Sequence, residues 1–240
     1  MNRLFLISTA FFVASLLIQT NAVADSNDPR WLKELSPTQL QIFQKCDSIY
    51  TIKKTPADYN ARDVHTLQRK KLVEGAHFTL SVRKGIGGNT GSLSDDLSYV
   101  LKQFPNHHPA LWVMGKLQLS NDFRPFKPGR NDYAYPSIDC YLKRALEFRP
   151  KDTNTYLVAA IIKHKQKKFD AAEKYYQFVL KHIPEHYEAH YNIGLMYFDQ
   201  GDTDLALKHA HEAYIGQYPL EGLKHKLQSI GAWVEPESEL

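Results

Sequence analysis

The chain has 240 residues, which allows one or two domains, and 43% of them are hydrophobic, enough to build a core. This composition excludes a wholly disordered protein. Its 30 basic and 26 acidic residues leave a formal net charge of +4, which is too small to indicate a nucleic-acid partner.

Residues 1–24 have the pattern of a secretory signal peptide. Arg3 gives a basic start, residues 4–18 are apolar apart from small residues, and Ala22–Val23–Ala24 forms a cleavage site. The apolar run is short for a membrane span, and no later run is long enough. We therefore expect a mature chain that begins near Asp25, is not inserted in a membrane, and is periplasmic or secreted. The alternative is a membrane anchor formed by an uncleaved N-terminal segment.

Residues 25–91 do not repeat and are predicted to form three helices. The first has a capped start at Ser36 and Pro37 and carries Cys46. The second covers residues 63–75, and the third is a short helix within residues 77–86. Since so few residues make a poor independent core, we expect this N-terminal helical region to cap the elements that follow it.

A glycine-rich segment, GIGGNTGS, occupies residues 85–92. Its glycine density is that of a phosphate-binding loop, but no Lys precedes Ser92 and no strand pattern precedes the glycines. The charge that would meet a phosphate is therefore missing, and we interpret the segment as a flexible connector.

Helical patterns continue from residue 92 to residue 150. A helix is predicted to start near Ser94 and Asp95 and to end before Pro105, and another has Pro109 in its first turn. An insertion, Asn121–Pro136, separates the second helix from a third that ends before Pro150.

A 34-residue sequence repeat follows, because residues 153–186 are matched position by position by the residues from 187 onward. Ala172 and Ala206, for example, share one position of the period. A period of this length is typical of stacked helical hairpins, in which small residues recur where two helices cross closely.

These residues resemble the tetratricopeptide repeat, whose pattern has an aromatic residue, then Leu-Gly, then alanines and a closing Pro. The positions that match are Tyr156, Ala172, Pro184, Ile193, Gly194, Ala206 and Ala213. The resemblance implies an all-α fold: a short α-solenoid of tetratricopeptide helical hairpins, with the N-terminal helical cap and a C-terminal capping helix. Further strings along the chain, such as LVEGAHFT and HYNIGLMYFDQGD, resemble exported bacterial proteins that contain these repeats.

Extended upstream, the resemblance divides residues 92–234 into the parts of an array. In chain order these are a half repeat at 92–105, a repeat with the insertion at 107–150, repeats at 153–186 and 187–219, and a capping helix at 220–231.

In such arrays the first helix of each hairpin lines a concave face, which implies a non-catalytic scaffold or adaptor that binds a protein or peptide. Carried over to this sequence, the groove residues are Val113, Leu117, Leu157, Ile161, His164, Tyr191, Asn192, Leu195 and Phe198. A mostly apolar groove can take an amphipathic helix or an extended peptide, but the chain's own N-terminal helices can also fill it. The sequence does not decide between these two alternatives, nor does it name the partner.

The insertion is a second candidate for partner contact, since aromatic and Arg residues on a proline-stiffened loop favour contacts. Its candidate residues are Phe123, Arg124, Phe126, Arg130 and Tyr133. The alternative is that the loop folds back on the array and buries its aromatic side chains.

Cys46 and Cys140 are the two cysteines of the chain, and an oxidising compartment favours a disulfide between them. The alternative is two unrelated buried thiols. Since the chain has no C-x-x-C pair, thiol–disulfide catalysis is not expected.

The histidines His182, His186 and His190 give the alternative function, a metal-binding or hydrolytic protein. A spacing of four puts His186 and His190 on one face of a helix, as zinc requires, but the adjacent Glu of the metalloprotease motif is absent. Packing between helices is the simpler interpretation of these rings.

No local signature joins a nucleophile to a base, so we expect no enzyme, no metal and no cofactor. The expected partner is a protein or peptide, with self-association of the repeats as a further possibility.

Overall fold

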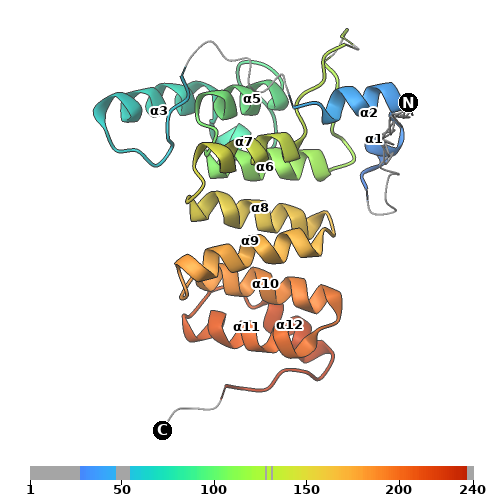
Figure 1. The fold of residues 1–240 in the computed structure, drawn as a ribbon, viewed down its shortest axis with the longest axis vertical. Helices are drawn as coiled ribbons and strands as arrows, with labels where there is room; N and C mark the ends of the chain where they lie inside the picture. Colours follow the sequence, from blue (N-terminus) through green and yellow to red (C-terminus); the bar gives the residue numbers. More distant parts are fainter. Residues whose placement is uncertain (1–27, 47–54, 128, 131, 237–240) are drawn as a thin grey trace, which may run out of the picture.

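The computed structural model describes residues 28–46, 55–127, 129–130 and 132–236, and their regular secondary structure is helical (Figure 1). Within these ranges the β-type pairing is one isolated antiparallel bridge between Phe126 and Ala134. The prediction of an all-α fold is confirmed. The predicted signal peptide at residues 1–24 lies outside the described residues. None of the described helices is long and apolar enough to cross a membrane.

The main body is a stack of helices that runs from α5 at one end to α12 at the other (Figure 1). An inner row consists of α6, α8, α10 and α12, in which each helix contacts the next, and α7, α9 and α11 pack beside them. The helices are α5 (Leu93–Gln103), α6 (His108–Leu119), α7 (Ile138–Phe148), α8 (Thr153–Lys165), α9 (Phe169–His182), α10 (Tyr187–Gln200), α11 (Thr203–Ile215) and α12 (Gly222–Ser229). Helices α8 and α9 form one hairpin, and α10 and α11 form the next.

The helix starts repeat because the same local capping recurs along the inner row. His107, Asp152 and His186 are the N-caps of α6, α8 and α10, and each side chain accepts a hydrogen bond from a backbone N–H of the first turn. Helix α5 starts earlier than predicted, at Leu93, because Ser92 is its N-cap and forms a capping box with Asp95.

Close contact within the inner row depends on a small residue at one repeated position, the eighth after each N-cap. A Cβ atom at Gly115 would lie 2.5 Å from Cδ1 of Ile162 on α8, and one at Gly194 would lie 2.5 Å from Cδ2 of Leu223 on α12. Ala160, which is fully buried, occupies the same position of α8. A larger side chain here would have to displace Ile162 or Leu223 from its packed position.

The N-terminal helices divide between two places. Helices α3 (Val64–His77) and α4 (Leu80–Lys84) pack on α5 and α6 at the end of the stack, whereas α1 (Arg30–Lys33) and α2 (Pro37–Gln44) lie on the other side of it (Figure 1).

Helices α1 and α2 are held by an aromatic cluster with the insertion. The ring of Trp31 makes edge contacts with Phe43 and Phe123, with centroid distances of 5.2 and 5.0 Å, and its Nε1–H donates to the Ser120 carbonyl at 3.0 Å. These helices therefore cover the insertion.

A disulfide joins Cys46 to Cys140, with a Cα–Cα distance of 5.3 Å and a sequence separation of 94 residues. The pairing predicted from the sequence is present. The placement of Cys46 on the first helix was wrong: α2 ends at Gln44, and Lys45 is extended with ψ of 117°, so Cys46 follows the helix. The bridge thus ties the segment after α2 to Cys140 on α7.

Removing this disulfide should weaken the fold through the unfolded state, because the bridge closes a long loop. We expect Cys46→Ser with Cys140→Ser to lower the free energy of unfolding by about 2–4 kcal/mol, measured by urea denaturation and circular dichroism. A thiol reductant should produce the same loss in the wild-type chain and no change in the double variant. A wild-type chain that is equally stable with and without reductant would contradict the expectation.

Candidate binding groove

A groove of about 450 Å³ lies across the inner row of helices. It is bounded by α6, α8 and α10, and by the segment that follows α11. Its lining residues are His108, Pro109, Trp112, Asn154, Leu157, Val158, Ile161, Lys165, Glu188, Tyr191, Asn192, Tyr218 and Leu220. The middle of the groove is apolar, and its charged groups stand at the edges.

Two tyrosines form the wall at the α10 end. The rings of Tyr191 and Tyr218 are 4.8 Å apart, and Tyr191 is buried with 7% of its surface exposed. Burial raises the pKa of Tyr191, and burial and the nearby Glu188 raise the pKa of Tyr218 to about 12. Both phenols are therefore neutral hydroxyls at physiological pH.

Trp112 forms the wall at the opposite end, on α6. Two lysine ammonium groups stand over its indole, Lys116 at 5.5 Å and Lys165 at 5.9 Å from the ring centroid. Among the described residues, neither lysine has a carboxylate within ion-pair distance. This end of the groove therefore combines a half-buried aromatic ring with uncompensated positive charge.

A second, smaller cavity of about 170 Å³ adjoins the groove and shares Pro109 and Trp112 with it. The other lining residues come from the N-terminal region and from α6: Tyr59, Glu74, Phe78, Arg83 and Val113. Trp112 thus separates two cavities, one built by the inner row and one closed by α3 and α4.

Glu74 is the acidic group of this second cavity, and its charge is compensated. Its Oε1 accepts hydrogen bonds from His107 Nε2 at 3.1 Å and from the Tyr59 hydroxyl at 3.1 Å, and its Oε2 lies 3.7 Å from Arg83 Nη2. The hydrogen bond from His107 lowers the pKa of Glu74, so the carboxylate stays ionised.

The structure brings four predicted groove residues together: Leu157, Ile161, Tyr191 and Asn192 line the groove. The other five lie elsewhere. Val113 is buried at 3% exposure beside the second cavity, and Leu117 packs against core side chains. His164 Nε2 lies 3.0 Å from an Asp199 carboxylate oxygen, and Leu195 and Phe198 are half-buried against the core of α10 and its neighbours.

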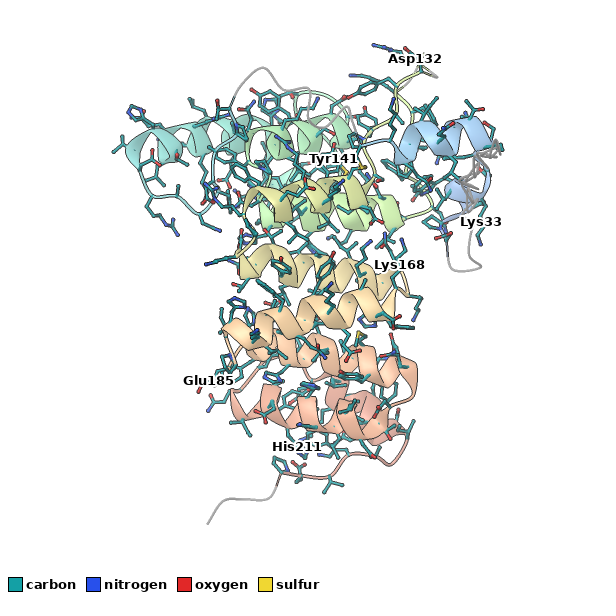
Figure 2. All side chains as sticks on the ribbon, in the orientation of Figure 1. Lys33, Asp132, Tyr141, Lys168, Glu185 and His211 are labelled. Atoms are coloured by element: carbon teal, nitrogen blue, oxygen red, sulfur yellow. A yellow bond between two sulfur atoms is a disulfide. The ribbon has the colours of Figure 1, made fainter. Side chains whose placement is uncertain are left out.

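Some of the insertion residues predicted to contact a partner are buried. Phe123 is 1% exposed in the cluster with Trp31, while Phe126 and Tyr133 are half-buried. Arg124 and Arg130 are exposed, and Arg130 Nη2 pairs with Asp132 Oδ2 at 3.0 Å near the loop tip, which projects away from the helices (Figure 2).

The three histidines of the metal alternative are engaged in separate hydrogen bonds. His182 Nδ1 lies 2.8 Å from the Phe178 carbonyl, His186 caps α10, and His190 lies between the Pro184 carbonyl and His209. Within the described ranges, no group of three or more His, Cys, Asp or Glu residues could hold a metal ion.

The glycine-rich segment binds a carboxylate of its own chain. Asp96, fully buried, accepts hydrogen bonds from the backbone N–H groups of Asn89 at 2.5 Å and Thr90 at 3.0 Å, and its Oδ1 lies 2.7 Å from His77 Nδ1. Burial alone would raise the pKa of Asp96, but the hydrogen bonds from Thr90, Asn89 and His77 lower it to about 2. The segment is thus organised around an internal anion.

The comparison with known families concerns the hairpins α8–α9 and α10–α11, which build most of this groove. A family model for the tetratricopeptide repeat matches residues 157–221, from α8 to the start of α12. This part of the chain consists of tetratricopeptide repeats. The chain matches none of the curated proteins with which it was compared.

Trp112 belongs to the groove although the repeat pattern did not identify it. Counted from the N-cap, Trp112, Leu157 and Tyr191 share one position of the helices α6, α8 and α10. The α6 residues predicted for the groove, Val113 and Leu117, each come one residue after the position that corresponds to a groove residue of α8. The insertion breaks the 34-residue period, so the register had to come from local signals. The matching capping histidines, His107 and His186, could have supplied it.

The pair His190–His209 within the last tetratricopeptide hairpin should make stability depend on pH. Their Nδ1 atoms are 2.9 Å apart, so one ring must donate and the other accept. Burial and the neighbouring His190 lower the pKa of His209 to about 4, compared with about 6.5 in an unfolded chain. This contribution is therefore complete above pH ~6.5 and is lost as pH falls towards 4.

We expect urea midpoints to fall between pH 7 and pH 4.5, and the fall to be smaller in His209→Gln by on the order of 1 kcal/mol, a figure reduced for solvent screening of the ring. The exposed His225→Gln is the matched control and should follow the wild-type profile. Equal pH profiles for all three proteins would contradict the role of this pair.

Proposed function

We propose that this protein is an exported, non-catalytic scaffold or adaptor that holds a peptide segment of a partner protein in the groove across α6, α8 and α10. Tetratricopeptide repeats are interaction modules, which supports the class. The observation that carries the proposal is the open groove of about 450 Å³ with an apolar middle and aromatic ends. We further propose that the array extends over residues 92–234.

The chemistry of the lining favours a peptide ligand. Trp and Tyr side chains dominate the energetics of protein interfaces, and here Trp112 and Tyr191 stand at opposite ends of an aliphatic stretch. Asn154 and Asn192 add amide groups that can pair with a peptide backbone. A cavity with aliphatic walls and few polar groups provides binding surface without an evident nucleophile.

Helices α1 and α2 leave this groove free. Trp31 and Phe43 pack on the insertion, and among the described residues of the N-terminal region only the α3–α4 side borders the groove, through the shared wall at Trp112. This arrangement supports an open surface.

The proposal of export rests on the predicted signal peptide and on the disulfide. Structural disulfides persist in oxidising compartments, which supports a periplasmic or secreted protein. Among the described residues, no specific contact favours the metal-binding or hydrolytic alternative, since His182, His186 and His190 have separate partners.

Site-specific photocrosslinking tests the groove. A photoreactive residue at Ile161, in the groove, should give a defined adduct in the producing cells, whereas the same residue at the exposed Lys174 of α9 should not. Trp112→Ala should reduce the Ile161 adduct, because losing an aromatic anchor costs about 2 kcal/mol or more in binding. Circular dichroism controls for folding of the variant. Identical adducts from both positions, or an adduct unaffected by Trp112→Ala, would argue against binding in the groove.

Processing of the N-terminus tests export. The mass of the protein purified from the extracytoplasmic fraction should correspond to a chain that begins at Asp25 with the disulfide formed. Ala24→Arg should block cleavage, because the site requires small residues. A protein that remains in the cytosol with intact residues 1–24 would refute the export part of the proposal.

A further inference from the structure

We propose that the binding groove continues past Trp112 into the second cavity, and that its ligand is an extended acidic segment. This segment places an apolar side chain on each side of Trp112 and a carboxylate between Lys116 and Lys165. The inference rests on the proposed function and deepens it, because it defines the chemistry of the partner and adds the non-repeat helices α3 and α4 to the site.

Continuity is the first argument. The two cavities share Pro109 and Trp112, and the helices α10, α8, α6 and α4 are consecutive neighbours. Helices that pack side by side are ~8–10 Å apart, so three steps cover roughly 25–30 Å. An extended chain at about 3.3 Å per residue spans this path with roughly eight or nine residues.

The walls select apolar side chains on both sides of Trp112. On the repeat side these walls are Leu157, Val158 and Ile161, and on the other side they are Phe78 and Val113. Phe78 and Val113 are each 3% exposed, so the small cavity has a fixed apolar floor. At 170 Å³ against 450 Å³, the small cavity takes fewer side chains than the groove.

The positive charge around Trp112 favours an acidic residue of the ligand at this point. In the second cavity Arg83 and Glu74 compensate each other and Lys70 lies over the Tyr59 ring at 3.7 Å, while Lys116 and Lys165 lie over Trp112 itself. Both ammonium groups approach the same indole, and a ligand carboxylate there would meet two positive charges. Glu188 stands at the far end of the groove, beyond Leu157, and disfavours an acidic residue there. The segment is therefore acidic near Trp112 and not near Tyr191.

A random nine-residue peptide library displayed on phage provides the probe, selected on the purified disulfide-bonded chain. We expect enriched peptides to carry Asp or Glu between two large apolar residues. Synthetic, fluorescein-labelled copies of the enriched peptides are then measured by fluorescence anisotropy. Lys116→Glu with Lys165→Glu, both at the surface, should weaken binding at least about tenfold at low salt, and Lys in place of the peptide's acidic residue should restore it.

Matched variants separate charge from position. Lys174→Glu with Lys181→Glu makes the same charge change on exposed positions of α9 and should leave binding unchanged. Val113→Phe fills the second cavity and should weaken binding of peptides with two apolar anchors more than of peptides truncated to one. Ile161→Glu should abolish binding of both kinds of peptide.

The outcomes distinguish the two proposals. Peptides that need Ile161 but bind equally well to the Lys116/Lys165 double variant and to Val113→Phe overturn this inference and leave the proposed function standing. Enrichment of basic or uncharged peptides overturns it as well. A library that yields no peptide sensitive to Ile161→Glu overturns both proposals.

Discussion

The close approach of neighbouring inner helices is the contact on which the rest of the structure depends. A Cβ atom at Gly115 or Gly194 would lie 2.5 Å from the end of the Ile162 or Leu223 side chain of the next inner helix, so these side chains pack directly on the glycines. Ala160 fills the same position with the smallest side chain that a helix favours. Glycine inside a helix costs about 1 kcal/mol relative to alanine, so tight packing between the helices must offset this cost. The spacing that results sets the width of the groove and the depth at which Trp112, Leu157 and Tyr191 lie in it.

The described residues of the N-terminal region attach to the stack on both sides of the groove. Asn106, fully buried in the turn between α5 and α6, donates to Asp58 at 2.7 Å and to Asp152 at 2.9 Å, and Arg149 Nε donates to Asp58 at 2.6 Å. These bonds fix the segment before α3 to two successive turns of the stack. On the other side, the disulfide and the Trp31 cluster fix α1 and α2 to α7 and the insertion. The attachments at both sides leave the groove between them accessible.

Much of the fold could be predicted from the sequence, because the repeat carries its own packing rules. The alanines at 172 and 206 and the recurring prolines mark helix pairs of a known period, and the two cysteines form the expected pair. The register of α6 could not be obtained in this way, because the insertion after α6 interrupts the period. The prediction therefore placed Val113 and Leu117 at the positions that Trp112 and Lys116 occupy. The end of α2 was also predicted wrongly. The extended backbone of Lys45 ends the helix before Cys46, which lies beside α7. Whether α1 and α2 fill the groove depends on contacts between Trp31 and Phe123, which lie far apart in the chain and follow no local pattern.

The arrangement around Asp96 has a consequence for the chemistry of the glycine-rich segment. Its backbone N–H groups form the kind of concavity that binds anions, and the ligand that they hold is a side chain of the same polypeptide. A tethered carboxylate has a very high effective concentration at such a site, on the order of millimolar or above for a short connection. These N–H groups are therefore already engaged by Asp96, and the contact closes the segment onto α5.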